Sequence, residues 1–307
     1  MLEVIQRSSD FLTRKGVESP RLQVELLLAY VLHMPRMKLY LNFERTLTDP
    51  ELETLRGLVK RRGEREPLQH IVGSVSFCGL EIMVNRDVLV PRPETELLAE
   101  EAWKFLLVVP DGNEMPEFPS PRPSPLNSRG EGEGVRSSMV CDFGTGSGCL
   151  ALAIAAKCPT ATVHALDVSE PALKVARENA ARLGLGERVL FHEGDGFGAL
   201  PAQARFDLIV SNPPYIPSAE IETLQPEVRE HDPRLALDGG PDGLDFYRRL
   251  AAEAGSRLKR VGRLMLELGD GQGRAVSELL TQQGWTVVSV LKDYSARARI
   301  LIARRSE

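Results

Sequence analysis

Apolar residues occur in short runs of strand length from residue 139 onward. The stretches between these runs have the length and the spacing of amphipathic helices. Strands that alternate with helices predict an α/β fold, in which a parallel sheet is covered by helices on both faces. The expected strands are 139–143, 162–168, 188–195, 206–212, 262–269, 286–291 and 299–304, and the expected helices lie near 148–157, 170–183, 243–259 and 272–283.

The first 68 residues have a helical pattern instead. Ser19 followed by Pro20 is typical of a helix start, and Thr48 with Glu51 has the spacing of a capping box. This part of the sequence contains no glycine-rich loop and no cluster of catalytic side chains. We therefore expect a small all-α N-terminal domain at 1–68 that serves substrate recognition rather than chemistry.

A linker and a second domain are expected after the helical part. Apolar and β-branched residues in 69–92 are interrupted by Gly73 and Gly79, which predicts short strands or a β-hairpin. The remaining residues, 93–307, are expected to form the catalytic domain. Within them, 110–138 has almost no apolar residues and carries 6 of the 21 prolines of the chain. Such a segment buries too little surface to offset its ordering entropy, so we expect a disordered surface insertion.

Charge and composition exclude several classes of function. The net charge of the 307 residues is -5, and a protein that grips nucleic acid by its phosphates usually has a basic excess, so no direct nucleic-acid partner is expected. No apolar run is long enough for a membrane span, and the N-terminus does not have a secretory signal. The four scattered cysteines form no C-x-x-C pair, so we expect a cytoplasmic protein without a disulfide or a metal site.

Although the net charge of the chain is negative, its sequence contains one cluster of basic residues. It lies at the end of a predicted helix, where cations interact favourably with the helix dipole. We interpret it as a solvated helix end, with contact to RNA or to an acidic partner as the less favoured alternative. The cluster consists of Arg56, Lys60, Arg61, Arg62 and Arg65.

A glycine-rich turn follows the first expected strand of the second domain. Its residues are Gly144, Thr145, Gly146, Ser147 and Gly148, and a helix is expected directly after them. Glycines let the backbone approach a ligand closely, and a helix N-terminus offers free N–H groups. The spacing G-x-G-x-G differs from the dinucleotide pattern G-x-G-x-x-G. The strand–turn–helix context favours a cofactor loop over a plain turn.

Two acidic residues follow the next two strands. Asp167 lies where a carboxylate accepts hydrogen bonds from the ribose hydroxyls of an adenosine-type ligand. The alternative is a helix N-cap, although Ser169 already serves as a good one. Asp195, next to Gly196, lies where the amino group of an adenine would be. Because Gly-Asp-Gly is also a common turn, the role of Asp195 stays open.

The most specific signal follows the fourth expected strand, at Asn212, Pro213, Pro214 and Tyr215. Two consecutive prolines cannot donate to a β-ladder, and their carbonyls are left free to accept other hydrogen bonds. The side-chain oxygen of Asn212 is a second acceptor, and Tyr215 offers a flat wall. Two acceptors that converge on one planar NH2 group can hold it against a methyl donor. We therefore expect Asn212, Pro213 and Tyr215 to be catalytic, with an ordinary Asn-Pro turn as the alternative.

Together these motifs resemble the HemK/PrmC family of peptide-chain-release-factor glutamine N5-methyltransferases. The similarity runs over about 66–305 and includes EPLQHIVG, VLVPRPETE, DFGTGSGCLALAIA, ALDVSEPAL, FDLIVSNPPYI, DPRLALDGGPDGLDFYRRL and LELGDGQG. The resemblance implies a helical N-terminal domain, a β-hairpin linker and a class I methyltransferase domain, whose Rossmann-like sheet has seven mostly parallel strands.

The resemblance also implies the ligands. The cofactor would be S-adenosylmethionine, and the substrate would be the glutamine of the Gly-Gly-Gln motif in bacterial release factors. Some relatives carry a tryptophan where Gly196 stands, which leaves open what forms the wall beside the adenine. The expected cofactor residues are Gly144, Thr145, Gly146, Ser147, Gly148, Asp167, Asp195, Gly196 and Asn212. The expected substrate residues are Asn212, Pro213, Pro214 and Tyr215.

Three alternative functions share some of these sequence features. A sister group methylates a glutamine of a ribosomal protein and shares the NPPY motif, but its linker more often has PRSPI and its loop begins with Cys, where this chain has PRPETE and Gly144. An adenine-N6 DNA methyltransferase also holds an NH2 group with such a motif, but it needs a basic face and a pocket for a flipped base. A cofactor-sensing module is disfavoured because a sensor does not need acceptors that grip an amide.

Overall fold

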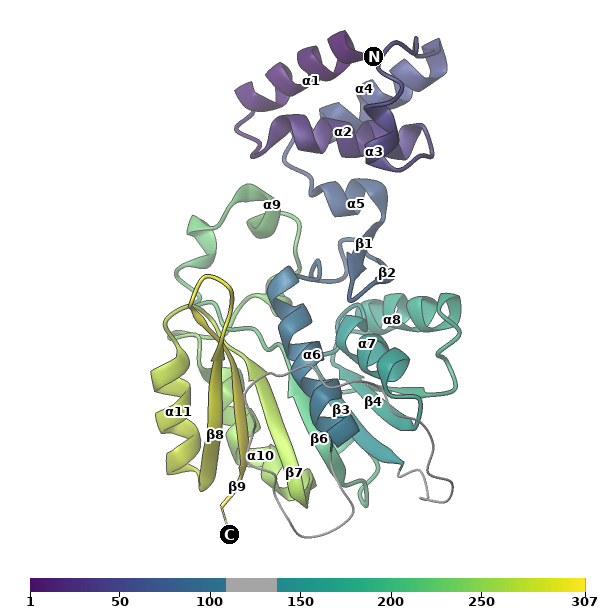
Figure 1. Ribbon diagram of the computed structural model, residues 1–307. Helices are drawn as coiled ribbons and strands as arrows, with labels where there is room; N and C mark the ends of the chain where they lie inside the picture. Colours follow the sequence, from purple (N-terminus) through teal and green to yellow (C-terminus); the bar gives the residue numbers. More distant parts are fainter. Residues whose placement is uncertain (109–136, 307) are drawn as a thin grey trace.

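The structure of the protein is a computed structural model that describes residues 1–108 and 137–306 (Figure 1). The insertion expected at 110–138 lies outside the described residues except for its last two positions. Ser138, at its end, already belongs to the first strand of the large sheet.

A seven-stranded sheet forms the centre of the second domain. Its strand order is β5-β4-β3-β6-β7-β9-β8. The first five strands in this order pair in parallel, and β9 is antiparallel to both of its neighbours, β7 and β8. All seven strands lie where the hydrophobic runs predict them, which confirms the class I methyltransferase fold. They are β3 (Ser138–Phe143), β4 (Ala161–Asp167), β5 (Val189–Glu193), β6 (Phe206–Ser211), β7 (Leu258–Glu267), β8 (Trp285–Lys292) and β9 (Ala298–Arg305).

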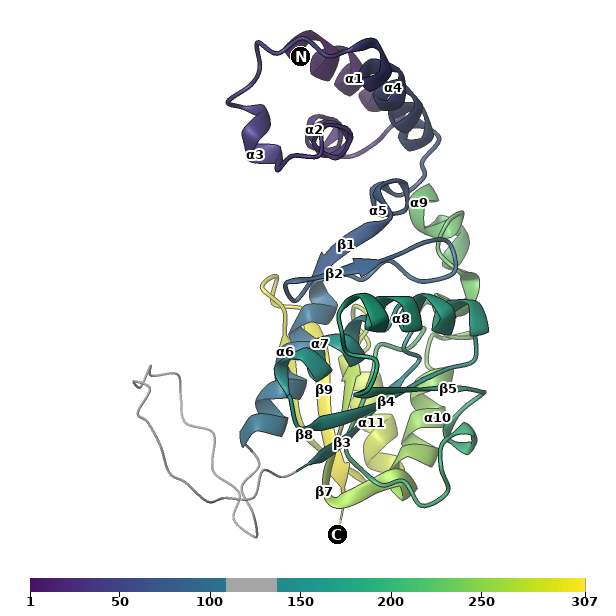
Figure 2. The same ribbon diagram turned by 90° about the vertical axis from the view of Figure 1, so that its right-hand side faces the viewer.

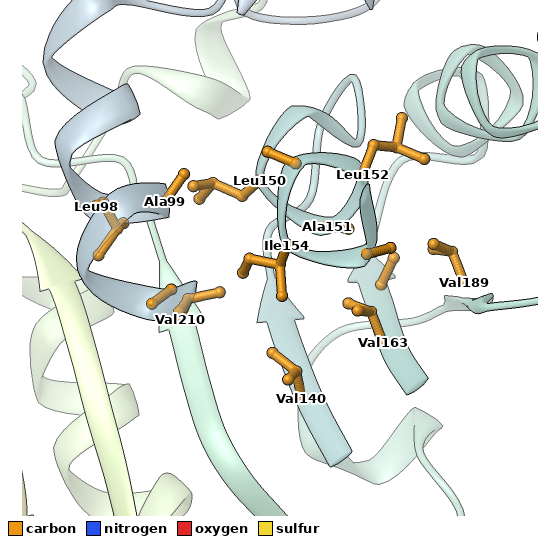
Figure 3. Packing of buried hydrophobic residues seen from close by; sticks show 14 of the residues in the cluster. Leu98, Ala99, Val140, Leu150, Ala151, Leu152, Ile154, Val163, Val189 and Val210 are labelled. Atoms are coloured by element: carbon orange, nitrogen blue, oxygen red, sulfur yellow. The ribbon is translucent and has the colours of Figure 1, made fainter. Parts of the chain in front are cut away.

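Helices cover both faces of this sheet (Figures 1 and 2). Successive strand residues point to opposite faces, so Val140 and Val210 belong to one hydrophobic core while Cys141 and Ile209 belong to the other. Figure 3 shows the first core, in which residues of α6 and α7 pack against the strands. The first core is covered by α6 (Pro93–Val108), α7 (Cys149–Lys157) and α8 (Glu170–Arg182), and the second by α10 (Asp245–Glu253) and α11 (Gly273–Gln282).

The N-terminal helices form a separate layer beyond one edge of the sheet domain (Figures 1 and 2). They share a hydrophobic core of their own, to which Leu12, Leu27 and Leu55 contribute. The capping box is present, because the backbone N–H of Thr48 donates to Glu51 Oε2 over 2.8 Å and Thr48 Oγ1 accepts from the N–H of Glu51. The helices are α1 (Leu2–Arg14), α2 (Pro20–Val31), α3 (Arg36–Leu39) and α4 (Asp49–Gly63).

The linker consists of a short helix and a hairpin. The helix α5 (Leu68–Val72) precedes β1 (Ser74–Phe77) and β2 (Leu80–Met83), which pair antiparallel. The buried side chain of Asn179 on α8 accepts from the backbone N–H of Met83 over 2.7 Å and donates to the carbonyl of Met83 over 3.0 Å. The hairpin is therefore attached to the sheet domain. The domain boundaries at 68 and 92 stay predictions.

The interpretation of the basic cluster as a solvated helix end is wrong for two of its members. Arg62 is 3% exposed, and both Arg62 and Arg65 donate to Glu227 of α9 (Pro226–Arg229) over distances of 2.5 to 2.7 Å. The ion pairs bridge the N-terminal domain and the segment that follows the NPPY motif. The prediction was wrong because Glu227 lies more than 160 positions away in the sequence, so the local charge pattern could not indicate these ion pairs.

Three further findings concern the cysteines, possible metal ligands and possible membrane spans. The four cysteines are free thiols, and Cys141 and Cys158 are buried. Across residues 1–108 and 137–306, no three His, Cys, Asp or Glu side chains are grouped so that they could hold a metal ion. In the same ranges no helix combines the length and the apolar character that a membrane span requires.

Candidate active site

The residues singled out from the sequence gather at one edge of the sheet. The glycine loop follows β3, Asp167 ends β4, and Asn212 follows β6 directly. These strands are parallel neighbours, so their carboxyl ends lie side by side at the same edge. The hydroxyl of Ser211 donates to the carbonyl of Phe143 over 2.7 Å, which joins the start of the NPPY motif to the start of the glycine loop.

The glycine loop needs its glycines for two different reasons. Gly144 and Gly146 have φ of 76° and 54°, and a Cβ added to either would meet no atom within 4 Å. They adopt a left-handed backbone and border open space. A Cβ at Gly148 would lie 3.1 Å from the Cβ of Ala176, so this glycine allows α7 to pack closely on α8. The open side of the loop leaves room for a ligand at Gly144 and Gly146.

A buried carboxylate, Asp142, lies beneath this loop. Its Oδ2 accepts from Thr145 Oγ1 over 2.6 Å and from the backbone N–H of Ala151 over 3.2 Å, whereas its Oδ1 is buried without a hydrogen-bond partner. Burial raises the pKa of Asp142 to about 7. Thr145 and Ser147 are themselves buried, so their side chains shape the loop from inside. The sequence pattern includes Asp142 in the motif but did not indicate a role for it.

The side chain of Asp167 is hydrogen-bonded to the glycine loop. Its Oδ2 accepts from the backbone N–H of Gly146 over 2.8 Å, and its Oδ1 accepts from the N–H of Ser169 over 2.9 Å. Burial raises the pKa of Asp167. The cap of α8 is Ser169, whose hydroxyl accepts from the N–H of Ala172. The structure thus separates the capping residue from the carboxylate at the strand end.

One arginine contacts both Asp195, whose side chain is exposed, and the buried Gly196. Arg249 of α10 forms an ion pair with Asp195, and a Cβ at Gly196 would collide with the guanidinium of Arg249. The same guanidinium carbon lies 5.9 Å from the centroid of the Phe143 ring. Arg249 therefore occupies the space into which a larger side chain at position 196 would extend. The sequence did not single it out, because it lies in an ordinary amphipathic helix.

In the NPPY corner, the side-chain amide oxygen of Asn212 faces away from α6. Asn212 Nδ2 donates to the hydroxyl of Thr95 over 3.1 Å, which leaves Asn212 Oδ1 as the outward acceptor. Within the described ranges no hydrogen bond is made to the carbonyl of Pro213. A Cβ at Gly239 would lie 2.9 Å from the carbonyl oxygen of Pro214, so that carbonyl is covered by the chain. Asn212 Oδ1 and the Pro213 carbonyl are the two acceptors that remain.

Glu267 at the end of β7 is a second buried carboxylate, after Asp142, and lies behind Asn212. The hydroxyl of Thr95 donates to Glu267 Oε2 over 2.6 Å, and the two residues are 2% and 1% exposed. Burial raises the pKa of Glu267 to about 7. Burial also raises the pKa of Tyr215 to about 12, and the charge on Glu267 adds to this shift. The sequence analysis gave no role to Thr95 or Glu267; an acidic residue inside an apolar strand run was the only signal for Glu267.

Gln272, between β7 and α11, holds three loops together at this edge. Its Oε1 accepts from the N–H of Gly269 over 3.1 Å, and its Nε2 donates to the carbonyls of Tyr215 and Gly243 over 2.9 and 3.3 Å. The backbone after Tyr215 also pairs with 237–239, through Ile216. The position of the NPPY corner is thus fixed from two sides.

Comparison with known proteins agrees with this architecture. The PrmC N-terminal domain family matches residues 3–73, and the Methyltransferase small domain family matches residues 131–231. A release factor glutamine methyltransferase from Geobacter sulfurreducens is 42% identical over 302 residues, which cover 98% of this chain and 95% of the relative. A second one, from Chlorobaculum tepidum, is 41% identical over 298 residues, with 96% and 94% covered.

Among solved structures, a methyltransferase from Pyrococcus furiosus is similar with a TM-score of 0.48 and 21% identity, covering 75% of this chain and 90% of that chain. The two curated relatives are similar over nearly their whole length, and they share both the helical part and the methyltransferase part with this protein. The chain belongs to the release factor glutamine methyltransferase family.

Proposed function

We propose that this enzyme transfers the methyl group of S-adenosylmethionine to the side-chain amide N5 of the glutamine in the Gly-Gly-Gln motif of peptide chain release factors. The observation that carries the proposal is the orientation of Asn212. Its Nδ2 is engaged by Thr95, so its Oδ1 and the carbonyl of Pro213 remain as acceptors beside the glycine loop. Two such acceptors match the two N–H groups of one carboxamide.

The cofactor fits the residues at this edge. The open space over Gly144 and Gly146 admits a ligand close to the backbone, and Asp167 offers a carboxylate at the end of β4 for ribose hydroxyls. We assign the cofactor to Gly144, Gly146 and Asp167, with Asp195 and Gly196 beside the adenine. The remaining assigned residues are Thr145, Ser147 and Gly148 of the loop, and Asn212. When bound, S-adenosylmethionine supplies a methyl group that is already activated by its sulfonium.

The residues of the chain then have to activate a poor nucleophile. An amide nitrogen has its lone pair delocalised into its own carbonyl. Hydrogen bonds from its two N–H groups to Asn212 Oδ1 and the Pro213 carbonyl favour charge on the nitrogen and fix its direction. Pro214 and Tyr215 form the wall of the acceptor site. As the nitrogen bonds the methyl carbon and the carbon–sulfur bond breaks, the amide becomes acidic and its released proton can pass to water, so a dedicated general base is not required.

The partner class follows from the family and from the arrangement of the domains. The curated relatives are release factor glutamine methyltransferases, and the N-terminal domain is attached to the segment after the NPPY corner by the Glu227 ion pairs. We infer that a release factor inserts its Gly-Gly-Gln loop at the NPPY corner while the N-terminal domain contacts the rest of it. Such a substrate belongs to the translation machinery, so the enzyme would act in the cytoplasm.

The test is methylation with labelled S-adenosylmethionine and three acceptors: a bacterial release factor, a ribosomal protein and double-stranded DNA. Label should appear on the tryptic peptide of the release factor that contains Gly-Gly-Gln, on the side-chain nitrogen. A release factor with Glu in place of that glutamine is the matched control and should stay unlabelled. Label on the ribosomal protein or on the DNA, with none on the release factor, would overturn the proposal.

A further inference from the structure

We propose that Thr95 and Glu267 form a positioning relay that fixes which atom Asn212 presents to the acceptor amide. The relay rests on the proposed function, since it explains how the NPPY corner keeps an oxygen and not an NH2 group facing the substrate. Thr95 and Glu267 do not touch the reacting atoms. They act through Asn212, from α6 and from the end of β7.

The direction of each hydrogen bond follows from counting protons. An ionised carboxylate only accepts, and a threonine hydroxyl has a single proton. With Glu267 ionised, the hydroxyl of Thr95 must donate to Glu267 Oε2, 2.6 Å away. It can then only accept from Asn212, 3.1 Å away, and the atom of Asn212 that donates is its NH2 nitrogen. The oxygen of Asn212 is consequently on the other side, toward the acceptor site.

Protonation of Glu267 removes this constraint. A protonated carboxyl can donate to the hydroxyl of Thr95, which frees the hydroxyl proton to donate to the oxygen of Asn212. The amide of Asn212 can then turn by half a rotation and present its NH2 group to the NH2 group of the substrate, where neither accepts. The relay therefore predicts that the ionised form of Glu267 is the active one.

The surroundings of Glu267 support a change of charge near neutral pH. Burial is the main cause that raises its pKa, to about 7, and the charge of Glu94 acts in the same direction. Arg299 and Arg92 lower it, as does the hydrogen bond from Thr95. Two phenols, those of Tyr215 and Tyr247, also interact with Glu267, and both stay neutral because burial raises the pKa of each.

Thr95→Val is the variant that isolates the hydroxyl. Valine keeps the branched shape of a 2% exposed side chain and removes only the hydrogen bonds. We expect kcat with a release factor to fall by roughly 10- to 100-fold, as for the loss of one orienting hydrogen bond, with the cofactor Kd changed by less than about threefold. Thr95→Ser should restore kcat to within about threefold of wild type. Thr281→Val, at an exposed threonine of α11, is the matched control and should leave kcat unchanged.

Glu267→Gln tests the charge. At saturating cofactor, kcat of the wild type should fall about tenfold from pH 8 to pH 6, as the ionised fraction of a group with a pKa near 7 does. The amide in the Glu267→Gln variant does not titrate. The fall of kcat toward low pH, the acidic limb of the pH profile, should therefore be absent whatever the absolute rate of the variant. A limb that persists unchanged in Glu267→Gln, or a Thr95→Val enzyme with the kcat of wild type, would refute the relay.

A readout without turnover separates the relay from the proposed function. The side-chain NH2 resonance of Asn212, identified by its absence in Asn212→Ala, should shift with pH around a midpoint near 7 in wild type and stay constant in Glu267→Gln. If the release factor is not methylated but this resonance titrates as stated, the proposed function fails and the relay stands. If methylation occurs but the resonance does not titrate between pH 6 and 8, the relay is wrong.

Discussion

Gly146 donates its backbone N–H to Asp167 Oδ2 over 2.8 Å, so the carboxylate at the end of β4 and the turn after β3 form one unit. The second oxygen of Asp167 is held by the N–H of Ser169, and its side chain cannot swing freely. The two elements that the cofactor would touch are thus in fixed positions relative to each other. Such preorganisation lowers the cost of ordering the site on binding.

Asp167→Asn should weaken cofactor binding without unfolding the protein. The amide keeps the shape but loses the charge and one acceptor, and hydrogen bonds to a charged group contribute about 1.5–3 kcal/mol. We expect the Kd for S-adenosylmethionine, measured by calorimetry, to rise roughly 10- to 100-fold. Asp10→Asn on the exposed face of α1 is the control and should bind like wild type. An unchanged Kd in Asp167→Asn would remove Asp167 from the cofactor site.

Asn212→Ala should abolish most of the transfer while the cofactor still binds measurably. The variant removes one of the two acceptors that hold the acceptor amide, an effect of about 10²- to 10³-fold on kcat by analogy with a lost oxyanion-hole donor. Single-turnover rates with a release factor measure the loss. Gln282→Ala removes a carboxamide from the exposed end of α11 and serves as the matched control. Near-normal turnover of Asn212→Ala would disprove the amide clamp.

The sequence predicted the elements of this fold better than it predicted the contacts between them. Strands, helices and the NPPY corner leave local signals, such as an apolar run or two adjacent prolines. The Thr95–Asn212 contact joins residues 117 positions apart, and the Thr95–Glu267 contact joins residues 172 positions apart. Only the assembled sheet brings them together, so neither periodicity nor spacing reveals them. Arg249 was missed for the same reason, since its partner Asp195 lies 54 positions away.

Glu227→Gln should loosen the attachment of the N-terminal domain. Arg62, which is 3% exposed, would keep its charge but lose its carboxylate partner. We expect a loss of roughly 1–3 kcal/mol in unfolding free energy, between the values for exposed and for buried pairs, together with a higher KM for the release factor. Denaturant unfolding and steady-state kinetics measure the two effects. Glu230→Gln, whose partner Arg229 is adjacent and partly exposed, is the control and should change neither.

Arg249→Ala tests whether the guanidinium beside Gly196 forms a wall of the adenine pocket. A guanidinium face next to an aromatic base is worth about 0.5–2 kcal/mol, so the cofactor Kd should rise roughly 3- to 30-fold. Arg274→Ala, at a side chain of α11 that is 90% exposed, controls for the loss of a positive charge. If Arg249 instead keeps Asp195 away from the adenine, its removal would tighten binding. A lower Kd in Arg249→Ala would therefore exclude the wall.

The stacked pair of His164 and His192 should make the protein sensitive to acid. Their ring nitrogens Nδ1 and Nε2 lie 2.9 Å apart, which requires that at least one of the two rings is neutral. Burial lowers the pKa of His164 to about 4, and the neighbouring His192 adds to this, whereas an unfolded histidine titrates near 6.5. Between these values the unfolded chain binds more protons than the folded one, so stability is lost as pH falls from 6.5 toward 4.

Urea midpoints at pH 7.5, 6.0 and 5.0 measure this loss. His164→Asn offers a side chain that does not titrate, and its midpoint should vary less with pH than that of wild type, even though the variant is less stable at pH 7.5. His33→Asn is the matched control, since His33 is exposed and has a left-handed backbone that Asn tolerates, and it should keep the pH dependence of wild type. Equal pH dependence in all three proteins would show that the buried pair does not couple folding to protonation.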